Sequence, residues 1–336
     1  MISKKTVIHL LAFTLAAALS LKLSTVGWYF LAPAYSGRKA GLTDAAKLKK
    51  TVTVLAEEIG PRDLFNNNKA RLRLAEDYIT LRLRAAGYKV EFQEYYSAGV
   101  KVKNIIASKP GRSAPGEIIL VGAHYDTFNN PGADDNASGV AGLLDLAEYA
   151  AKRGFARTVT FVAFVNEEPP FFKNEGMGSA VYASAAAKRG DDIKAALVLE
   201  MIGYFTEKRI SQRYPPFIGP FFPSRGNFMA QISDLRSRAL AAQAGKAFRG
   251  ASTLPLRTAV LPAFVPGADY SDHRSFWRAG YPAVMFTDTS FYRTPHYHKP
   301  SDLPETLNYE YMAAFQDGMK AVLDELAVSD QRLAKK

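Results

Sequence analysis

Apolar and polar positions alternate along the chain in a way that predicts strands and helices in turn. Two amphipathic helices are expected first, one from Thr43 as its cap to about Glu58 and one from Asn68 to Ala86. Strands are expected at Lys89–Tyr95, Val102–Ser108, Ile118–Ala123, Thr158–Val165, Ala195–Leu199 and Ala283–Thr287, and further helices at Gly139–Lys152, Ser179–Lys188, Phe228–Ala244 and Tyr309–Leu326. Such alternation is typical of an α/β fold. We expect a single domain whose largely parallel, mixed β-sheet is flanked by helices on both faces.

Residues 1–34 differ from the rest of the chain. Lys4 and Lys5 precede an uncharged run from Thr6 to Leu21, which is shorter than the roughly 20 residues of a membrane-spanning helix and therefore favours an export signal. A second apolar stretch, Val26–Ala32, follows, so the whole segment could instead anchor the chain in a membrane. Both forms predict an exported protein, periplasmic or otherwise extracytoplasmic. The folded domain is expected over residues 35–336.

Composition narrows the chemistry that the chain can perform. With 48% hydrophobic and 22% charged residues, the chain is a folded globular protein and not a disordered one. It contains no cysteine, which excludes thiolate zinc sites, iron–sulfur clusters and cysteine nucleophiles. The net charge of +11 is spread along the sequence, so we expect no nucleic-acid binding. Any metal ion must be held by histidine and carboxylate side chains.

Polar residues gather where the predicted strands end. His124 and Asp126 follow one strand, and Asp134, Asp135 and Asn136 come soon after. Glu167 and Glu168 follow the next strand, Glu200 ends another, and His296 and His298 follow the last. Ligands in open parallel sheets bind beyond the carboxyl ends of the strands, so these side chains are expected to meet.

Each of these groups also has an ordinary explanation. By itself, His124 would be a hydrogen-bonded surface or core residue, Asp134–Asn136 a helix cap, and the Glu167-Glu168 pair a solvated loop. Together they indicate a metal site, because buried carboxylates need a cation. Neighbouring side chains point in different directions, so one glutamate of the pair can bind metal while the other acts as a base.

The charge of the carboxylates suggests how many metal ions the site holds, but the spacing of the residues does not identify every ligand. Two Zn²⁺ ions with one hydroxide would neutralise the carboxylates of Asp135, Glu168 and Glu200. Asp126 could hold the second ring nitrogen of His124. Spacing alone does not choose between His296 and His298 as the last ligand. His273 follows Asp272 and is expected to cap a helix or support the site without binding metal.

These motifs resemble those of the M28 family of zinc peptidases, a group that includes aminopeptidases, glutaminyl cyclases and glutamate carboxypeptidases. The resemblance runs from about Ile59 to Asn308. It rests on Gly122-Ala123-His124-Tyr125-Asp126, Gly132 to Gly139, Asn166-Glu167-Glu168, Gly176-Met177-Gly178-Ser179, Ser271-Asp272-His273, and Tyr297-His298 followed by Asp302.

The resemblance implies two zinc ions and a role for each site residue. His124, Asp135, Glu168, Glu200 and His298 would bind the metals, with Asp135 bridging. Glu167 would be the general base, Asp126 would support His124, and Tyr297 would stabilise the oxyanion. Similar proteins also have a cis peptide bond after the bridging aspartate, here Asp135-Asn136.

Two departures from the family pattern concern the substrate. Glu200 stands where the simplest secreted aminopeptidases have Asp, and that residue also helps bind the free amine. Pro169–Asn174 lengthens the loop after Glu168 and is expected to shape the substrate mouth. The Pro- and aromatic-rich stretch Tyr214–Pro223 is expected to be either a packed loop or a wall of the pocket.

The sequence therefore predicts a zinc-dependent exopeptidase with peptide substrates, most simply an aminopeptidase, in which a metal-bridged water attacks and Glu167 takes its proton. Glutaminyl cyclase-like or carboxypeptidase-like activity on the same scaffold is one alternative. A non-catalytic binding ectodomain is another. Membrane association through the N-terminal segment is a further possibility.

Overall fold

The computed structural model describes residues 41–215, 219 and 222–328. The predicted signal or anchor at residues 1–34 lies outside this part of the chain. The helices are α2 (Ala45–Thr53), α3 (Lys69–Ala85), α4 (Gly139–Ala151), α5 (Gly178–Arg189), α6 (Arg238–Ala251), α7 (His273–Arg278) and α8 (Tyr309–Leu326). The strands are β1 (Val90–Ser97), β2 (Val100–Lys109), β3 (Ala114–His124), β4 (Arg157–Phe164), β5 (Asp192–Glu200), β6 (Met229–Ser233), β7 (Leu256–Val260) and β8 (Ala283–Thr287).

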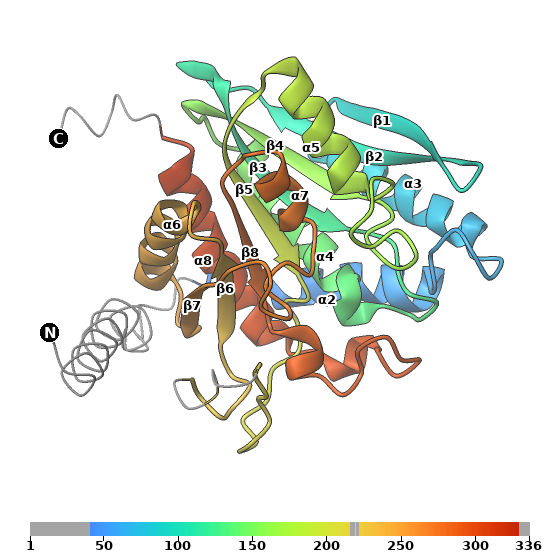
Figure 1. Cartoon of the computed structure of the whole chain (residues 1–336), viewed down its shortest axis with the longest axis vertical. Helices are drawn as coiled ribbons and strands as arrows, with labels where there is room; N and C mark the ends of the chain where they lie inside the picture. Colours follow the sequence, from blue (N-terminus) through green and yellow to red (C-terminus); the bar gives the residue numbers. More distant parts are fainter. Residues whose placement is uncertain (1–40, 216–218, 220–221, 329–336) are drawn as a thin grey trace, which may run out of the picture.

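The described strands form one eight-stranded sheet in the order β1-β2-β4-β3-β5-β8-β6-β7 (Figure 1). Its centre is parallel, since β3 pairs with both β4 and β5, and β5 pairs with β8. Strands β1 and β2 join antiparallel at one edge, and β6 runs antiparallel to β8 and parallel to β7 at the other. The mixed, largely parallel sheet predicted from the sequence is confirmed.

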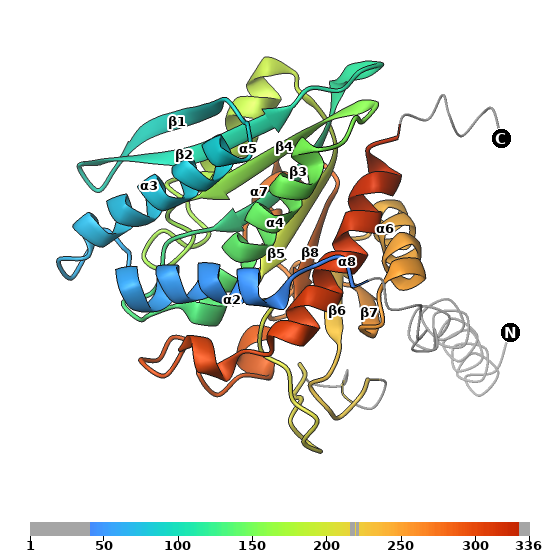
Figure 2. The ribbon, with the colours of Figure 1, turned by 180° about the vertical axis from the view of Figure 1, so that it is seen from behind.

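Helices cover the sheet on both faces, as predicted. Helices α2, α3, α4 and α8 lie on the face seen in Figure 2, where Leu143 and Phe315 belong to the larger apolar core. Helices α5 and α7 cover the opposite face, seen in Figure 1, where Phe164 packs against Phe276 in a smaller core. Alternate residues of each central strand enter one core or the other, which explains why these strands are apolar along most of their length.

The predicted helix at residues 228–244 is wrong in its first half. Residues Met229–Ser233 form β6, which pairs with β7 and β8, and α6 begins only at Arg238. A short apolar run fits a strand and a helix equally well, and pairing with two neighbours decides for the strand. Strand β7 and helix α7 were not predicted.

The first helix begins one residue later than predicted. Asp44 is the cap, because its side chain accepts a hydrogen bond from the Ala46 backbone N–H. The Thr43 hydroxyl instead donates to Asp317 in α8. The helix continues as a wider π-helical turn over Val54–Ile59 and ends at Gly60, close to the predicted stop.

Between residues 41 and 328, apart from the undescribed positions 216–218, 220 and 221, no helix is long and apolar enough to cross a membrane.

Candidate metal centre

The predicted site residues meet at one end of the sheet. His124 is the last residue of β3 and Glu200 the last of β5, while Glu167 and Glu168 follow β4. His298 lies in the segment after β8. Because β3, β4, β5 and β8 are parallel, their carboxyl ends lie at the same edge, and the loops that follow them converge there.

Five side chains form two groups with the geometry of metal ligands. In the first group, His124 Nε2 lies 3.3 Å from both Asp135 Oδ1 and Glu200 Oε2. In the second group, His298 Nε2 lies 3.3 Å from Asp135 Oδ2 and 3.1 Å from Glu168 Oε2. The two groups therefore share Asp135, which offers one oxygen to each. These are the five residues that the family resemblance implies as ligands, and His298, not His296, is the histidine that lies with them.

The spacing of these atoms fits zinc. Ligand atoms about 2.0–2.1 Å from a tetrahedral Zn²⁺ are roughly 3.3 Å from one another. Within the described residues, His124 Nε2, His298 Nε2 and Glu168 Oε1 are buried without a hydrogen bond of suitable geometry. Buried polar atoms are rarely left in this way in a folded protein unless something else binds them. Two divalent cations at these positions would satisfy the atoms and neutralise the carboxylates.

The electrostatics of the site also call for positive charge. Burial lowers the pKa of His298, but Asp135 and Glu168 outweigh it and bring this pKa to about 10. Burial likewise opposes protonation of His124, yet Glu200 and Asp126 hold its pKa well above the usual value. Burial, reinforced by Asp135, raises the pKa of Glu168 to about 8. Without metal, the site retains protons where cations would otherwise bind.

Asp126 supports the site more broadly than predicted. Its Oδ1 lies 3.6 Å from His124 Nδ1, and its backbone carbonyl lies 3.2 Å from the same nitrogen. Its two carboxylate oxygens accept hydrogen bonds from the backbone N–H groups of Glu167 and Glu168, both at 3.1 Å. Asp126 thus fixes the loop that carries both glutamates as well as facing the imidazole.

The Asp135 loop is held by Asp302 and by the side chain of its own Asn136. Asp302 accepts hydrogen bonds from the backbone N–H groups of Asp134 and Asp135. The Asn136 side chain accepts one from Gly139 N and donates one to Leu199 O, so it caps α4 and ties the loop to β5. The predicted cis peptide bond at Asp135-Asn136 is present.

Arg62 supports the same loop and was missed by the sequence analysis. Its side chain is fully buried, and burial lowers the pKa of its guanidinium to about 10. It donates hydrogen bonds to five backbone carbonyls, those of Leu55, Gly60, Tyr125, Pro131 and Gly132. Arg62 therefore joins the end of the first helix to Tyr125, which follows His124, and to Pro131 and Gly132, which precede Asp135.

Replacing Arg62 with Met should destabilise the protein strongly, because several buried carbonyls would lose their donor. We expect a loss of about 3 kcal/mol or more in the free energy of unfolding, measured by urea denaturation. Arg62→Lys keeps the charge but cannot reach all five carbonyls. Its free energy of unfolding should therefore lie between those of Arg62→Met and the native chain. Equal stability of Arg62→Met and the native chain would show that these contacts are not what holds the loop.

Glu167 and Tyr297 lie beside the metal ligands. Glu167 Oε2 is 4.0 Å from His124 Nε2, and this carboxylate belongs to neither ligand group. Burial, reinforced by Glu200 and Glu168, raises the pKa of Glu167 well above its usual value. The Tyr297 ring stacks on His298 with 3.8 Å between centroids. Burial raises the pKa of Tyr297, so its hydroxyl stays protonated at neutral pH.

Ser271 belongs to a motif of the sequence, but the sequence analysis gave it no role. Its hydroxyl donates to Glu200 Oε2 at 2.7 Å and is completely buried. His273 is also buried, and its Nε2 donates to the backbone carbonyl of Ala268.

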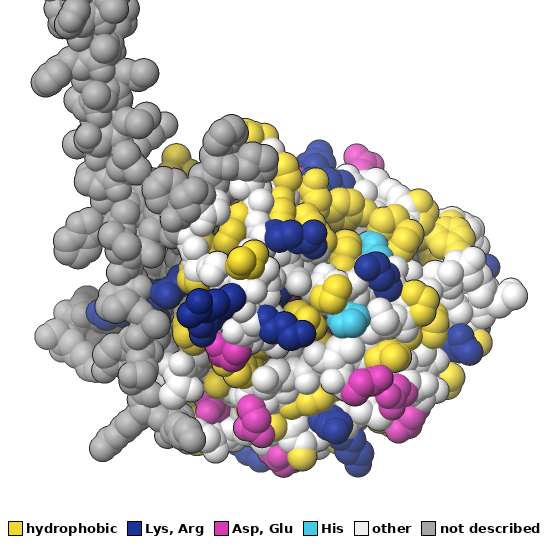
Figure 3. Space-filling view, turned by 90° about the horizontal axis from the view of Figure 1, so that it is seen from below, with side chains coloured by type: hydrophobic (Ala, Val, Ile, Leu, Met, Phe, Trp, Pro, Cys, Tyr) yellow, Lys and Arg dark blue, Asp and Glu magenta, His cyan; other side chains and the backbone are white. Residues whose placement is uncertain are grey.

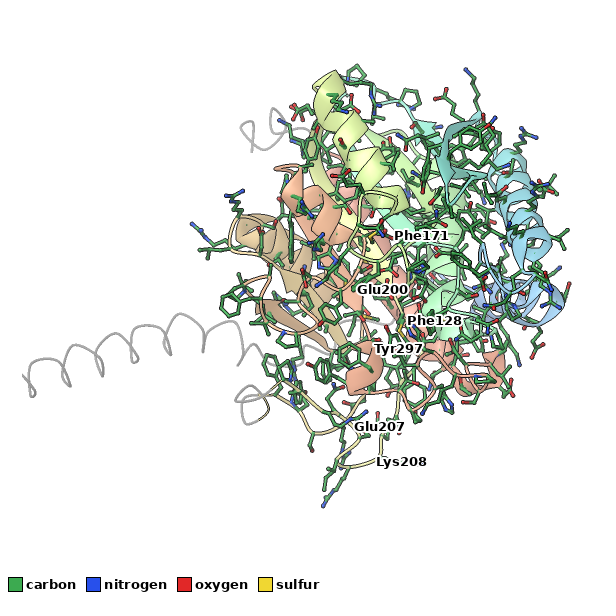
Figure 4. All side chains as sticks on the ribbon, turned by 45° about the vertical axis from the view of Figure 1, so that its right-hand side comes forward. Phe128, Phe171, Glu200, Glu207, Lys208 and Tyr297 are labelled. Carbon is green, nitrogen blue, oxygen red and sulfur yellow. The ribbon has the colours of Figure 1, made fainter. Side chains whose placement is uncertain are left out.

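A cavity of about 460 Å³ opens beside the metal ligands. Glu200 and Tyr297 both line it, and Figure 4 shows them in the middle of the molecule near Phe128. Tyr214, Pro215 and Phe222 also line it, which confirms the pocket-wall alternative for these described residues of the stretch. Pro169 and Phe172 from the lengthened loop do so too, as predicted. On the surface at this end, histidine is visible among apolar and basic side chains (Figure 3).

The sequence matches peptidase family M28 over residues 104–323. The chain belongs to this family. It is 38% identical over 287 residues to the uncharacterized protein YfbL of Escherichia coli K12, a match that covers 82% of this chain and 87% of that protein.

More distant relatives are described as zinc enzymes. A probable zinc metalloprotease of Pyricularia oryzae is 27% identical over 266 residues, which is 69% of this chain and 51% of that protein. The chain thus spans about half the length of this relative. The solved structure of a zinc aminopeptidase from Bacillus subtilis shares the fold, with a TM-score of 0.65 and 17% identity over 85% of this chain and 96% of that one.

Proposed function

We propose that this M28 chain is a zinc-dependent exopeptidase, and that it acts as an aminopeptidase. The observation that carries the proposal is the pair of ligand groups that share Asp135, with Glu167 beside them and a cavity at their edge. In this proposal His124, Asp135 and Glu200 hold one zinc ion. Asp135, Glu168 and His298 hold the other.

The side chains around the ligands then have distinct tasks. Two bound zinc ions would activate a water molecule and polarise the scissile carbonyl. Glu167 accepts the proton of the attacking water and returns it to the leaving amine, and its raised pKa suits both steps. The Tyr297 hydroxyl, which remains protonated, donates a hydrogen bond to the oxygen that becomes negative. Asp126 keeps the glutamate loop and the His124 ring in place.

The ligand set argues against the alternatives. Glutaminyl cyclisation needs one metal ion and no attacking water, whereas two complete groups are present here. A non-catalytic binding domain has no need to keep buried imidazole and carboxylate atoms without partners. Glu200 ends β5 within the first group and stands where the simplest secreted aminopeptidases have Asp, so the substrate scan below decides between an aminopeptidase and a carboxypeptidase.

The decisive experiment is a substrate scan with metal-free protein and protein given one or two equivalents of zinc. We expect leucinamide to be hydrolysed at least about 100-fold faster with two equivalents than with none, and N-acetylleucinamide to remain intact. Release of a cyclised product from glutaminyl peptides would support the cyclase. Shortening of peptides from the carboxyl end would support a carboxypeptidase. Purified protein that binds no zinc would support the non-catalytic alternative.

A further inference from the structure

We propose that the cavity accepts an unbranched apolar group longer than any apolar side chain among the twenty amino acids, on the acyl side of the scissile bond. This inference rests on the proposed aminopeptidase function and names the substrate class of the same site. The substrate would be an amide of a 2-amino acid that carries a long alkyl chain.

The floor of the cavity is a part of the sheet that no described helix covers. Helices α5 and α7 shield the central strands on this face, but they pack against β2, β5 and β8 and leave β6 and β7 open (Figure 1). Ala230 and Ile232 of β6 and Ala259 of β7 line the cavity. Their neighbours Met229 and Leu256 point to the other face and enter the large core. The floor is therefore a flat, largely apolar surface that continues from the metal ligands.

The strand register gives the length of this floor. Glu200 pairs with Thr287, Thr287 with Ala230, and Ala230 with Arg257, so one row crosses four strands. Four strands span three intervals of about 4.8 Å, or roughly 14 Å from the metal centre to β7. The next row on the same face contains Met285, Ile232 and Ala259. No ordinary side chain extends from the scissile bond to the far end of these rows.

The volume leads to the same conclusion. An apolar cavity of about 150 Å³ holds a benzene ring. The cavity here is about 460 Å³, which is roughly three times as large. A single leucine or phenylalanine side chain at the mouth would leave most of it unfilled. Small residues, Ala230 and Ala259, make it deep at the two strands farthest from the metal ligands.

Aromatic rings on three loops line the cavity. Phe172 of the lengthened loop contacts Tyr270, with 5.6 Å between centroids, and Tyr270 contacts Phe291 at 6.0 Å. Lys173 fixes this arrangement through an ion pair with Asp269 at 2.6 Å. Gln212 and Arg213 line its wall, and Arg257 lies at the β7 end of the first floor row, so the lining carries some polar groups. The mainly apolar lining suits a flexible hydrocarbon chain.

The test uses the zinc-loaded full chain and amides of 2-aminobutanoic, 2-aminohexanoic, 2-aminooctanoic, 2-aminodecanoic and 2-aminododecanoic acids. Each methylene that enters the cavity should raise kcat/KM about threefold to fourfold until the far end is reached. We expect the optimum to lie beyond 2-aminohexanoic acid, whose chain is about as long as that of methionine. An optimum at 2-aminobutanoic or 2-aminohexanoic acid would overturn the proposal.

Ala259→Phe tests the position of the far end. The added ring should fill the deep corner and lower the ratio of kcat/KM for the longest substrate to kcat/KM for 2-aminobutanamide at least about tenfold. Val260→Phe is the matched control, because it adds the same ring to the opposite face of β7. It should leave the length profile, which is the dependence of kcat/KM on the alkyl chain length of the substrate, unchanged. Equal length profiles for Ala259→Phe and the native chain would place the hydrocarbon elsewhere.

A binding measurement separates this inference from the proposed function. Calorimetry with metal-free protein and butanol, hexanol and octanol needs no catalysis. We expect affinity to rise with chain length in the native chain and this rise to be lost in Ala259→Phe. If octanol binds in this way but no amide is cleaved, the aminopeptidase proposal fails and the long cavity stands. If amides are cleaved but octanol binds no better than butanol, the long cavity is rejected.

Discussion

Glu167→Gln should abolish most turnover while leaving the zinc content near two ions per chain. Glutamine keeps the size of the side chain, but its amide cannot accept a proton from the attacking water. Glu167 belongs to neither ligand group, so its replacement removes no metal contact. General-base catalysis contributes about 10²–10⁴-fold, and we expect kcat for leucinamide to fall by that factor with KM little changed. Steady-state kinetics and metal analysis of the same preparation measure both quantities.

Two neighbouring glutamates provide controls for this variant. Glu168→Gln should lose zinc as well as turnover, because its carboxylate belongs to the second ligand group. Glu175→Gln, in an exposed position of the same loop, should change neither. Activity of Glu167→Gln within about threefold of the native value would require a different base.

The sequence was most informative where periodicity was long or a strand was buried. The helix at Tyr309–Leu326 was predicted with its observed bounds, and the centres of the parallel strands were predicted because both of their faces enter apolar cores. It failed at Met229–Ser233, where five residues carry too little periodicity to separate a strand from a helix. That strand is defined by its pairing with β7 and β8, and such long-range contacts leave no local pattern.

The candidate ligand set could be proposed from the sequence because metal chemistry restricts residue types. Histidine and carboxylate side chains at the ends of parallel strands can meet only at one edge, and the structure brings all five together there. Spacing alone left His296 and His298 open, and family resemblance chose His298. The structure separates them, because His296 Nδ1 lies 2.9 Å from the Ser301 hydroxyl while His298 Nε2 lies beside Asp135.

The supporting contacts were much harder to predict. Arg62 acts through backbone carbonyls, and a carbonyl is present at every position whatever the side chain, so no pattern in the sequence points to the pairing. Ser271 stood in a recognised motif, but its contact with Glu200 depends on a fold that brings residues 71 positions apart within 2.7 Å. Residue type therefore indicates candidate metal ligands better than it indicates the residues that hold those ligands in position.

Asp135→Asn should lower zinc stoichiometry from two ions to one or fewer. Asp135 is the one residue that belongs to both ligand groups, with one carboxylate oxygen 3.3 Å from each histidine nitrogen. An asparagine amide offers a single oxygen, so it cannot serve both groups. Replacing a residue that only orients a ligand lowers metal affinity 10–100-fold. Replacing Asp135 itself should therefore lower the zinc affinity of the weaker site by more than about 100-fold. Competition with a zinc chelator measures both affinities, and hydrolysis of leucinamide should fall with the second ion.

The adjacent aspartate separates loss of a bridge from general damage to the loop. Asp134 is as buried as Asp135 but belongs to neither ligand group, and its Oδ1 accepts a hydrogen bond from Gly203 N that an asparagine oxygen can also accept. Asp134→Asn should therefore keep both zinc ions. Two tightly bound ions in folded Asp135→Asn would refute the shared carboxylate. Loss of zinc from both variants alike would mean that the loop, and not the bridge, determines binding.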